Sequence, residues 1–502
     1  MALNAAIATY RADALAPLSE WTWDDYPRRL FRYDLAAQYY NATVYSELAK
    51  YAAQHRKARQ LYRHIRAIYN PAERVVATYV DKVYGGPLDF EHLTTGAIPL
   101  VGLDDRLTNA IRQLWRWSNW QKAKSLYVRY GALYGDSVIK VVDDRARRKV
   151  RLEVLHPGKL AEAEFDAVGN VKTCVIRYER EDPDTGRRYV YEEHIDGEQF
   201  ATFRDGQPWA YYQDENEQPV PAWPNDYGFV PVVVAHHKDT GFAWGENAFQ
   251  TVLPLLDELN DQASALNDQV RKSVRAIWGV FGANGANISA ATDEKGGVPM
   301  LFFPDASDAK PLVSDLDLAA AIQNVMVHLE EVERRLPELA LTQIRRQEHL
   351  TAPGVRAGWS DAIGKIVEAR GNYDDGLIRA QMMAITMGGI GQYENFEPFG
   401  PDDYARGNLE HYVAERPVIK DSLAKQEKIT ALQTVKDLPP ALARLVLQEL
   451  DYADEVIEAV LSELAEAQAQ AVAAAVRGFA QGVFGENGAA DEAEEERVDV
   501  EA

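Results

Sequence analysis

The chain has almost no cysteine, because Cys174 is the only one among its 502 residues. A single thiol excludes an intrachain disulfide framework and any metal site built from several thiolates. Cys174 lies in an alternating run of polar and apolar residues from Val171 to Tyr178. We therefore expect it to be buried in a strand rather than to act as a nucleophile.

Long hydrophobic runs are also missing. No run approaches the ~20 apolar residues that a membrane-spanning helix needs. The first residues, Met1 to Ile7, have neither the basic segment nor the apolar core of a secretory signal. The sequence therefore predicts a protein without membrane contact that is made and kept in a reducing cytoplasm.

Positive charge is scarce as well. The 54 Lys and Arg residues stand against 77 Asp and Glu residues, which gives a net charge of −23. This argues against a protein that grips nucleic acid over its whole surface, because phosphate binding needs local positive charge. The negative charge does not exclude a protein that lets DNA slide past a mostly acidic surface. A role in solubility alone is the simpler explanation of this charge.

The signatures of common catalytic sites are absent. The sequence has neither a G-x-x-x-x-G-K-[ST] loop for triphosphate nor a G-x-S-x-G nucleophile elbow. The segment His328 to Val332 lacks the second histidine of a zinc protease motif. Since His236 and His237 are adjacent in an expected strand, they point to opposite faces and suit a shared metal poorly. We expect no catalytic residue, no metal site and no cofactor.

Helical periodicity dominates the part of the chain from Gly245 to Pro337. Two runs repeat apolar residues at steps of three and four, one from Val252 to Val274 and the other from Leu316 to Leu336. Between them lie glycines and two short apolar segments, Ile277–Phe281 and Met300–Phe303. This pattern predicts two long helices that flank a small separate lobe.

The remaining segments predict a mixture of helices and strands. Residues 1 to about 130 have helical spacing, whereas residues 135 to 235 alternate with a period of two between turn residues and predict one antiparallel meander. We expect residues 340 to 360 to be irregular and residues 420 to 482 to be helical. The predicted fold class is α+β and mainly α-helical.

Three stretches, read in order, resemble one known family. They are Trp120–Ser137, which leads into a Gly-Asp-Ser strand start, Tyr227–His237 followed by Gly245–Phe249, and Leu255–Val270, which contains an L-x-D-E-L-N pattern. Together with the helix–lobe–helix pattern, they resemble the portal proteins of tailed bacteriophages of the siphovirus type. The resemblance extends over nearly the whole chain.

The resemblance implies a portal fold with a β-rich wing region, two long stem helices around a small α/β clip, and a helical C-terminal crown. It implies the following boundaries: wing 1–244, first stem helix 245–274, clip 275–313, second stem helix 314–337, tunnel loop 338–360, wing helix and return segment 361–419, crown 420–482 and an acidic disordered tail 483–502.

The resemblance also implies a function. Such proteins form a homo-oligomeric ring, usually of twelve subunits, at one vertex of the virion capsid. Double-stranded DNA is packaged and ejected through the ring without sequence specificity. The expected partners are terminase, the head–tail adaptor, the major capsid protein and the scaffolding protein, with assembly in the host cytoplasm.

Two groups of residues are candidates for these roles. The tunnel loop would face DNA, although the same residues could pair with acids of a neighbouring subunit; its candidates are Arg345, Arg346, His349 and Arg356. The stem helices would bury apolar side chains between subunits, with the candidates Leu255, Leu259, Leu266, Val270, Ile322 and Leu329.

Two alternatives from other classes stay open. The first is a metal-dependent DNA-processing enzyme that holds Mg²⁺ between Asp143 and Asp144, although caps and turns explain this acidic pair better. The second is a helical virion adaptor or scaffold that binds proteins and forms no ring with a channel.

Overall fold

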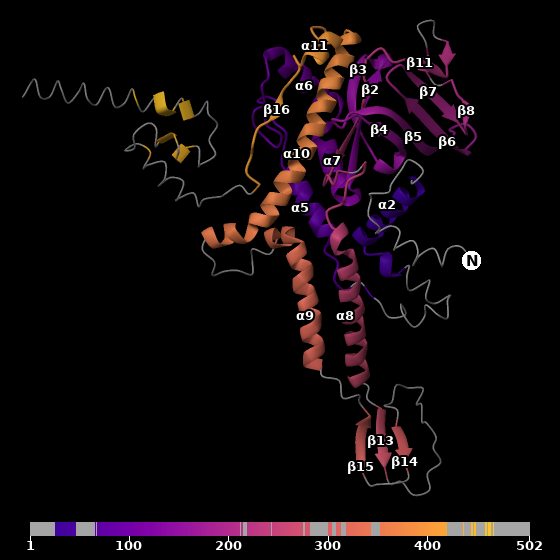
Figure 1. Cartoon of the computed structure of the whole chain (residues 1–502), viewed down its shortest axis with the longest axis vertical. Helices are drawn as coiled ribbons and strands as arrows, with labels where there is room; N and C mark the ends of the chain where they lie inside the picture. Colours follow the sequence, from indigo (N-terminus) through magenta and orange to yellow (C-terminus); the bar gives the residue numbers. More distant parts are fainter. Residues whose placement is uncertain are drawn as a thin grey trace, which may run out of the picture. The chain divides into compact units, whose positions relative to one another are not determined.

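A computed structural model describes most of the first 418 residues and isolated positions after them. The described residues are 26–46, 66, 68–210, 212–213, 218–241, 243–274, 277–281, 300–303, 308–312, 318–342, 352–418 and a few positions between 435 and 465. The chain divides into two compact units, Met1–Val418 and Ile419–Ala502. The first unit mixes helices and sheets, which confirms the α+β class (Figure 1).

Helices dominate the early part of the first unit, as the sequence predicts. They are α2 (Tyr26–Tyr40), α5 (Ala72–Tyr84), α6 (Asp105–Trp117) and α7 (Trp120–Tyr134). Asp104 caps α6 by accepting a hydrogen bond from the backbone N–H of Leu107 at 2.7 Å. Gly135, with φ at +98°, ends α7 in the left-handed conformation that glycine adopts most easily.

The predicted single meander is wrong, because the strands form two larger sheets and a separate two-stranded hairpin. In the three-stranded sheet, β2 (Asp136–Asp144) lies between β3 (Lys149–Leu155) and β12 (Val232–His236). β12 returns from a distant part of the sequence and pairs with β2, with Val234 opposite Val138. Alternating hydrophobicity predicts strands but does not specify which strand pairs with which.

The larger sheet has the order β11-β7-β6-β5-β4, with β8 added to β7. All its pairings are antiparallel. The buried Cys174 lies in β5, which confirms the expectation for this residue. The strands are β4 (Leu160–Phe165), β5 (Val171–Glu181), β6 (Arg188–Ile195), β7 (Gln199–Arg204), β8 (Gln207–Pro208) and β11 (Ala222–Pro224); β9 (Tyr212–Gln213) and β10 (Pro219–Val220) form a separate hairpin.

The long helix α10 (Ala352–Ile390) packs against the sheet of β12, β2 and β3, and its Tyr373 contacts Tyr127 of α7. Tyr373 of α10 lies over Gly131 of α7, where an added Cβ would lie 2.0 Å from the Tyr373 hydroxyl. In return, Tyr127 of α7 lies over Gly376 of α10, where an added Cβ would lie 2.6 Å from the Tyr127 hydroxyl. Two glycines therefore leave room for two buried tyrosines between α7 and α10.

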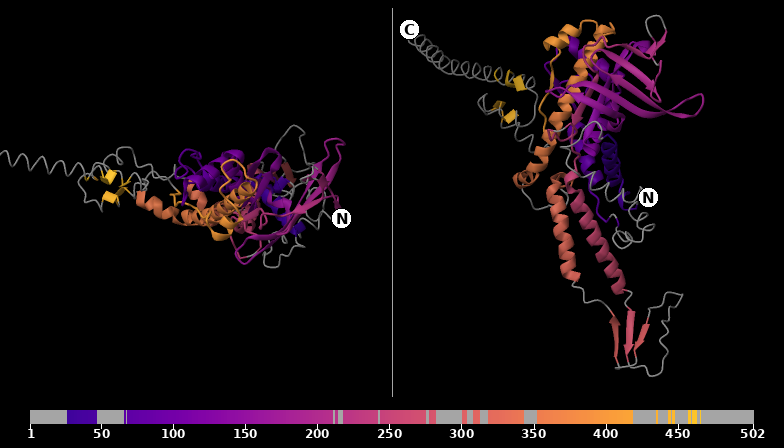
Figure 2. Two further views of the ribbon diagram at one scale, coloured as in Figure 1. Left: turned by 90° about the horizontal axis from the view of Figure 1, so that it is seen from above. Right: turned by 45° about the vertical axis from the view of Figure 1, so that its right-hand side comes forward.

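Two further helices lie side by side (Figures 1 and 2). A short 3₁₀ turn leads into α8 (Leu253–Val274), and α9 (Leu318–Arg335) runs beside it. Their contact is partly polar, since Gln262 accepts a hydrogen bond from Asn324 at 2.8 Å and lies 3.2 Å from a ring nitrogen of His328. The first helix begins at Leu253 rather than at Gly245.

A three-stranded sheet occupies the chain between α8 and α9. Its central strand β13 (Ile277–Phe281) is parallel to β14 (Met300–Phe303) and antiparallel to β15 (Asp308–Leu312). The sequence predicts the first two strands correctly and misses β15. An α/β lobe was expected, but the residues that the structure describes here all lie in strands.

The segment after α9 differs from the expected irregular loop. The 3₁₀ helix η6 (Pro337–Thr342) follows α9, residues 343–351 lie outside the described part, and α10 already begins at Ala352. Pro353 and Gly354 suggest a break, but proline is tolerated in the first turn of a helix. The unit ends with α11 (Pro401–Arg406) and β16 (Tyr412–Val413), which pairs with β1 (Leu100–Val101).

In the second unit, the described positions are helical, as the sequence predicts for residues 420–482. Val435, Ala443, Leu447 and Ile457 are buried together in a small apolar cluster. The acidic tail from residue 483 lies outside the described part. Among the helices that the structure describes, none is long and apolar enough to cross a membrane.

Candidate functional site

Two of the stretches that carry the family resemblance meet at two glycines. A Cβ on Gly135 would lie 2.4 Å from the carbonyl oxygen of Gly245, and a Cβ on Gly245 would lie 2.5 Å from the carbonyl oxygen of Gly135. Neither position has room for a larger residue. The start of β2 is therefore in direct contact with the segment that leads to α8.

Asp136 connects these backbones to two further elements. Its carboxylate is 1% exposed and accepts hydrogen bonds from the Tyr33 hydroxyl at 2.9 Å and the Gly245 N–H at 2.8 Å. The Nδ1 atom of His236 lies 2.7 Å from the same carboxylate. We call Tyr33, Gly135, Asp136, His236 and Gly245 the junction cluster, because they join α2, β2, β12 and the approach to α8.

The two adjacent histidines have opposite electrostatic environments. Burial lowers the pKa of His236, but the hydrogen bond and the charge of Asp136 outweigh it, so that the pKa is raised. Burial lowers the pKa of His237 to about 3. His237 points to the other face, where its Nδ1 atom lies 2.9 Å from the Tyr373 hydroxyl. The pair does not converge on a common ligand, as the strand geometry predicts.

A buried arginine supports the junction cluster from α2. Arg29 is 2% exposed, and its guanidinium carbon lies 3.5 Å from the ring centroid of Trp244. It donates hydrogen bonds to the carbonyl oxygens of Leu160 and Ala161. No local sequence pattern indicates this residue, because its hydrogen-bond partners lie more than a hundred residues away along the chain.

The polar residues of the L-x-D-E-L-N pattern bind the protein's own N-terminal segment. Asp257 accepts hydrogen bonds from the hydroxyls of Tyr39 at 2.7 Å and Tyr45 at 2.9 Å. Asn260 is fully buried and accepts from the backbone N–H groups of Ile68 at 2.8 Å and Tyr69 at 2.9 Å. One face of α8 is therefore already occupied within a single chain.

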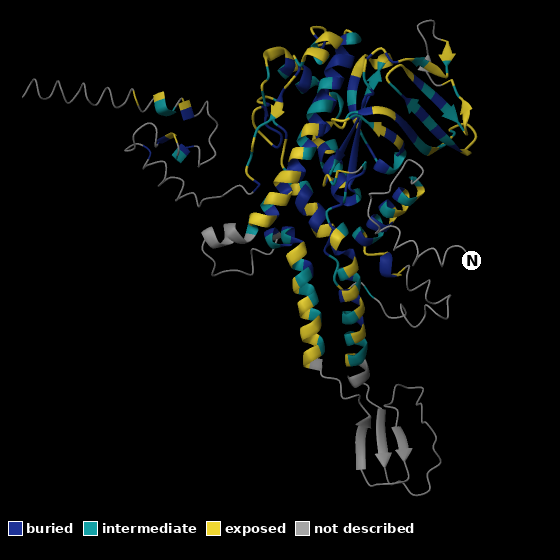
Figure 3. Cartoon of the chain, in the orientation of Figure 1, coloured by how far each residue is buried: buried dark blue, intermediate teal, exposed yellow. Residues whose placement is uncertain are grey.

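The six predicted interface residues therefore differ in how much of their surface a neighbouring subunit could contact. Leu259 is 2% exposed and so offers little surface to another subunit, whereas Val270 is 41% and Ile322 is 51% exposed. Leu255, Leu266 and Leu329 are half-buried. Met326 and Val327 on α9, which were not among the predicted interface residues, are 46% and 52% exposed. Figure 3 shows exposed residues along much of α9. The accessible apolar surface of the helix pair thus lies mainly on α9.

The expected tunnel loop begins at a buried carboxylate. Glu338 in η6 has no exposed surface and accepts a hydrogen bond from the Tyr79 hydroxyl at 2.6 Å. The ammonium group of Lys365 on α10 lies 3.3 Å from the same carboxylate and also donates to the carbonyl oxygen of Arg335. These contacts fix the end of α9 against α5 and α10.

The four predicted DNA-facing residues cannot be placed as a group. Arg345, Arg346 and His349 lie outside the described residues. Arg356 lies in the first turns of α10 rather than in a loop, and its side chain is outside the described part. Their role remains a prediction.

The acidic pair of the enzyme hypothesis is engaged in structural contacts. Both carboxylate oxygens of Asp143 accept tyrosine hydroxyl groups, from Tyr227 at 2.8 Å and from Tyr393 at 2.6 Å. Asp144 accepts the backbone N–H of Arg147 at 3.2 Å, which is the capping role that the sequence favours. The described residues contain no group of three or more His, Cys, Asp or Glu side chains able to hold a metal ion.

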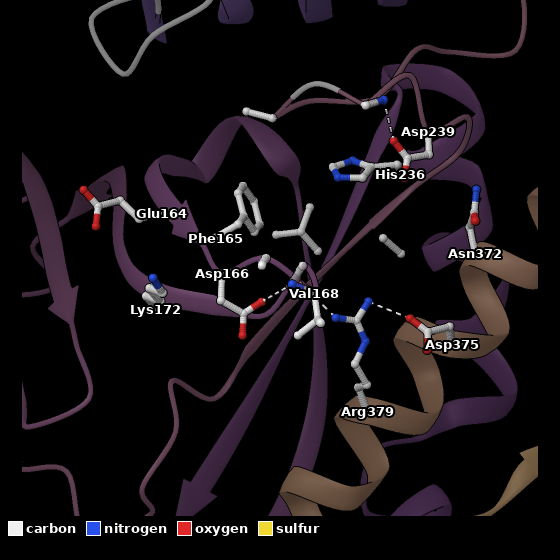
Figure 4. A pocket seen from close by; sticks show the side chains of 16 residues that line it. Glu164, Phe165, Asp166, Val168, Lys172, His236, Asp239, Asn372, Asp375 and Arg379 are labelled. Atoms are coloured by element: carbon white, nitrogen blue, oxygen red, sulfur yellow. Dashed lines mark hydrogen bonds and ion pairs between the residues drawn. The ribbon is translucent and has the colours of Figure 1, made fainter.

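A cleft of about 730 Å³ lies beside the junction cluster, between the β4–β5 turn, the end of β12 and α10 (Figure 4). Arg379 crosses it, binding Asp375 at 2.6 Å and the carbonyl oxygen of Gly169 at 3.1 Å. None of the lining residues is a serine, threonine or cysteine, so the cleft offers no hydroxyl or thiol nucleophile. Its polar groups join α10 to the larger sheet.

Comparison with known proteins identifies the family of the chain. The family described as phage portal protein, SPP1 Gp6-like, matches residues 19–333, a segment that includes the junction cluster, α8, the three-stranded lobe and most of α9. A search of curated proteins found no match. Because the family match covers more than half of the 502 residues, the chain belongs to the phage portal proteins.

Proposed function

We propose that this chain assembles into the portal ring at one vertex of a phage capsid and that double-stranded DNA is packaged and ejected through the ring. The observation that carries the proposal is a helix pair that leads to a separate small sheet, in a chain of the portal family. In this proposal the ring also docks terminase and the head–tail adaptor, and contacts the major capsid and scaffolding proteins.

The proposed parts follow the chain. Residues 1–244 and 361–419 form the wing, and the two stem segments, 245–274 and 314–337, contain α8 and α9. The strands between them form the clip, and the segment 338–360 contributes the tunnel loop. Residues 420–482, which belong to the second unit, form the crown. In this arrangement the junction cluster holds the first stem helix on the wing.

Exposed apolar side chains on α9 support contact with a second copy of the chain. Ile322, Met326 and Val327 are each about half exposed in a single subunit. Covering them removes apolar surface from water, which is favourable by about 25 cal/mol per Å². In a ring, the neighbouring subunit is the partner that meets the same helix in every copy.

The acidic character of the chain supports transport of DNA rather than tight binding. Each phosphate contact adds affinity, so a channel lined densely with cations would hold the DNA back. A few positive side chains in the tunnel loop would suffice to guide the duplex. We propose Arg345, Arg346, His349 and Arg356 for this role.

Electron microscopy of the purified protein with rotational class averaging tests the proposal. The expected result is rings of about twelve subunits with a central hole wide enough for duplex DNA. Compact monomers or dimers without a channel would overturn it and favour an adaptor or scaffold. Metal-dependent cleavage of a plasmid by the purified protein would instead favour the enzyme hypothesis.

A further inference from the structure

One long part of this acidic chain is basic. Residues 106 to 151 contain 12 Lys or Arg residues and only 3 Asp or Glu residues, whereas acids outnumber bases in the whole chain by 77 to 54. Most of these cations are exposed on the surface of α6, α7 and the connection between β2 and β3: Arg106, Arg116, Lys122, Arg129, Arg145, Arg147, Arg148 and Lys149.

The densest part is the tip of the β2–β3 hairpin, from Arg145 to Lys149, which we call the basic hairpin. The side chain of Arg147 is 72% exposed and that of Arg145 is 46% exposed. Asp143 and Asp144 pair with these two arginines at 3.2 and 3.4 Å. These two acids balance only part of the charge at the tip.

The basic hairpin is held firmly on the protein. Arg148 donates a hydrogen bond to the carbonyl oxygen of Gln392 at 2.6 Å, and its guanidinium carbon lies 5.4 Å from the ring centroid of Tyr393. The ammonium group of Lys149 lies 6.0 Å from the ring centroid of Trp117. Since these side chains are already ordered, binding a ligand costs less conformational entropy.

A groove extends the positive surface from the hairpin along α7. It has a volume of about 680 Å³ and lies between α7 and the edge strand β3. Lys122, Arg129 and Arg151 line it, and Glu153 is the one acid among its lining residues. Lys122 and Arg129 are seven residues apart and therefore lie on the same face of α7.

This surface is far from the expected tunnel loop. Lys365, in the first half of α10, contacts the end of α9, and Gln392 contacts the basic hairpin just beyond the last residue of α10. At 1.5 Å per residue, the helical segment between them spans roughly 40 Å. A DNA duplex that contacts the basic hairpin therefore contacts a part of the subunit that is distinct from the expected tunnel loop.

We propose that the basic hairpin and the α7 groove bind the phosphate backbone of duplex DNA on the outside of the ring, separately from the channel. Guanidinium groups suit phosphate oxygens, and contacts to the backbone require no particular base sequence. An acidic protein is the less favoured partner. Protein interfaces rely on large apolar anchors, and no large hydrophobic side chain between residues 106 and 151 is exposed. The inference rests on the proposed function, because that function supplies both the ring and the DNA.

Covalently closed circular duplex DNA tests the outer surface selectively, because a closed circle cannot be threaded through a preformed ring. Binding of the full-length ring to relaxed circles would be measured across a series of salt concentrations. The test variant is Arg147→Gln/Lys149→Gln. The matched control is Arg187→Gln/Arg188→Gln, which removes two exposed cations from the β5–β6 turn.

We expect the test variant to bind circles roughly tenfold more weakly and to lower the slope of log affinity against log salt by about 2, since each phosphate contact contributes about 0.9. The control should bind like the unaltered protein. Equal affinities of the two variants, or no binding of circles by unaltered rings, would overturn the proposal. Micrographs of the same preparations separate this failure from that of the proposed function, which would show as an absence of rings.

Discussion

At the scale of single residues, Asn260 shows how a polar side chain can hold two distant segments together. It has no exposed surface, and its amide satisfies the backbone groups of Ile68 and Tyr69. Replacing Asn260 by alanine would remove the side-chain partner of the Tyr69 N–H and carbonyl groups, whereas the Ile68 N–H keeps a second acceptor, the carbonyl oxygen of Arg66. We expect Asn260→Ala to lower the free energy of unfolding by about 2–3 kcal/mol, measured by denaturant titration.

Asn324→Ala provides the control for this prediction. Asn324 also donates a side-chain hydrogen bond, to Gln262, but it is exposed on α9. Its replacement should change the free energy of unfolding by less than about 0.5 kcal/mol. Equal effects of the two substitutions would show that the N-terminal segment does not depend on Asn260.

The pKa shifts of the two adjacent histidines predict opposite effects of pH on the stability of the fold. The folded-state pKa of His236 is raised by Asp136, so its stabilising contribution is complete below the ordinary pKa of about 6.5 and is lost as the pH rises through the raised value. The pKa of His237 is lowered to about 3 by burial, so the fold loses stability as the pH falls from about 6.5 toward 3.

Unfolding midpoints of the unaltered protein, His236→Gln and His237→Gln across this pH range test both signs. The destabilisation caused by His236→Gln should be larger at about pH 6 than at about pH 9. His237→Gln should remove part of the loss of stability on the acidic side. Parallel pH profiles for all three proteins would contradict the assigned protonation states.

Individual contacts of this kind could be predicted only in part. The divergence of His236 and His237 follows from strand geometry and needs no knowledge of the fold. The partners of Asn260 lie about 190 residues away in the sequence, and no local pattern indicates them. The sequence therefore predicts α8 as an apolar stem helix and misses the polar side chains that bind its own chain.

At the scale of elements, the packing between α7 and α10 depends on small residues. A Cβ on Gly376 would lie 2.6 Å from the Tyr127 hydroxyl and 3.0 Å from the Cβ of Ala235. We expect Gly376→Ala to lower the free energy of unfolding by about 1–3 kcal/mol, because the helix and the sheet would have to separate. Thermal unfolding monitored by circular dichroism provides the measurement.

Gly371→Ala is the matched control on the same helix. Nothing lies within 4 Å of an added Cβ at Gly371. Alanine has the higher helix propensity, so this substitution should be neutral or stabilising by up to about 1 kcal/mol. A loss of stability comparable to that of Gly376→Ala would mean that helix packing is not the cause.

The elements themselves were predictable to different degrees. The periods of α8 and α9 identify both helices, because an amphipathic face is a local property of the sequence. The separation of the strands into two sheets depends on β12 pairing with β2, which is a long-range choice. The start of α10 was missed for a local reason, since Pro353 in a first turn looks like a break in the helix.

At the scale of the whole molecule, assembly depends on what a single chain leaves exposed. Apolar spacing alone selects residues on both α8 and α9 for the interface. The structure distinguishes the two helices by exposure: Leu256 and Leu259 of α8 are buried within the chain, whereas Ile322 and Val327 of α9 are about half exposed. Substitutions at the exposed positions can therefore test assembly without disturbing the fold of one subunit.

We expect Ile322→Asp/Val327→Asp to abolish rings and to leave folded monomers. A carboxylate held at a buried subunit contact loses its hydration, which costs far more than the contact gains. The same carboxylate on an exposed monomer surface should change the free energy of unfolding by less than about 0.5 kcal/mol. Light scattering after size-exclusion chromatography measures the mass, and circular dichroism the fold.

Gln323→Asp is the control, since Gln323 is also exposed on α9 and lies next to Ile322. It introduces the same charged group without removing an apolar side chain, so rings should persist. If the double variant also forms rings, the subunit contact lies elsewhere and α9 faces solvent in the assembly. If it yields unfolded chains, these positions contribute to the fold of one subunit. Monomers that retain their helical signal would show that α9 carries the contact between subunits.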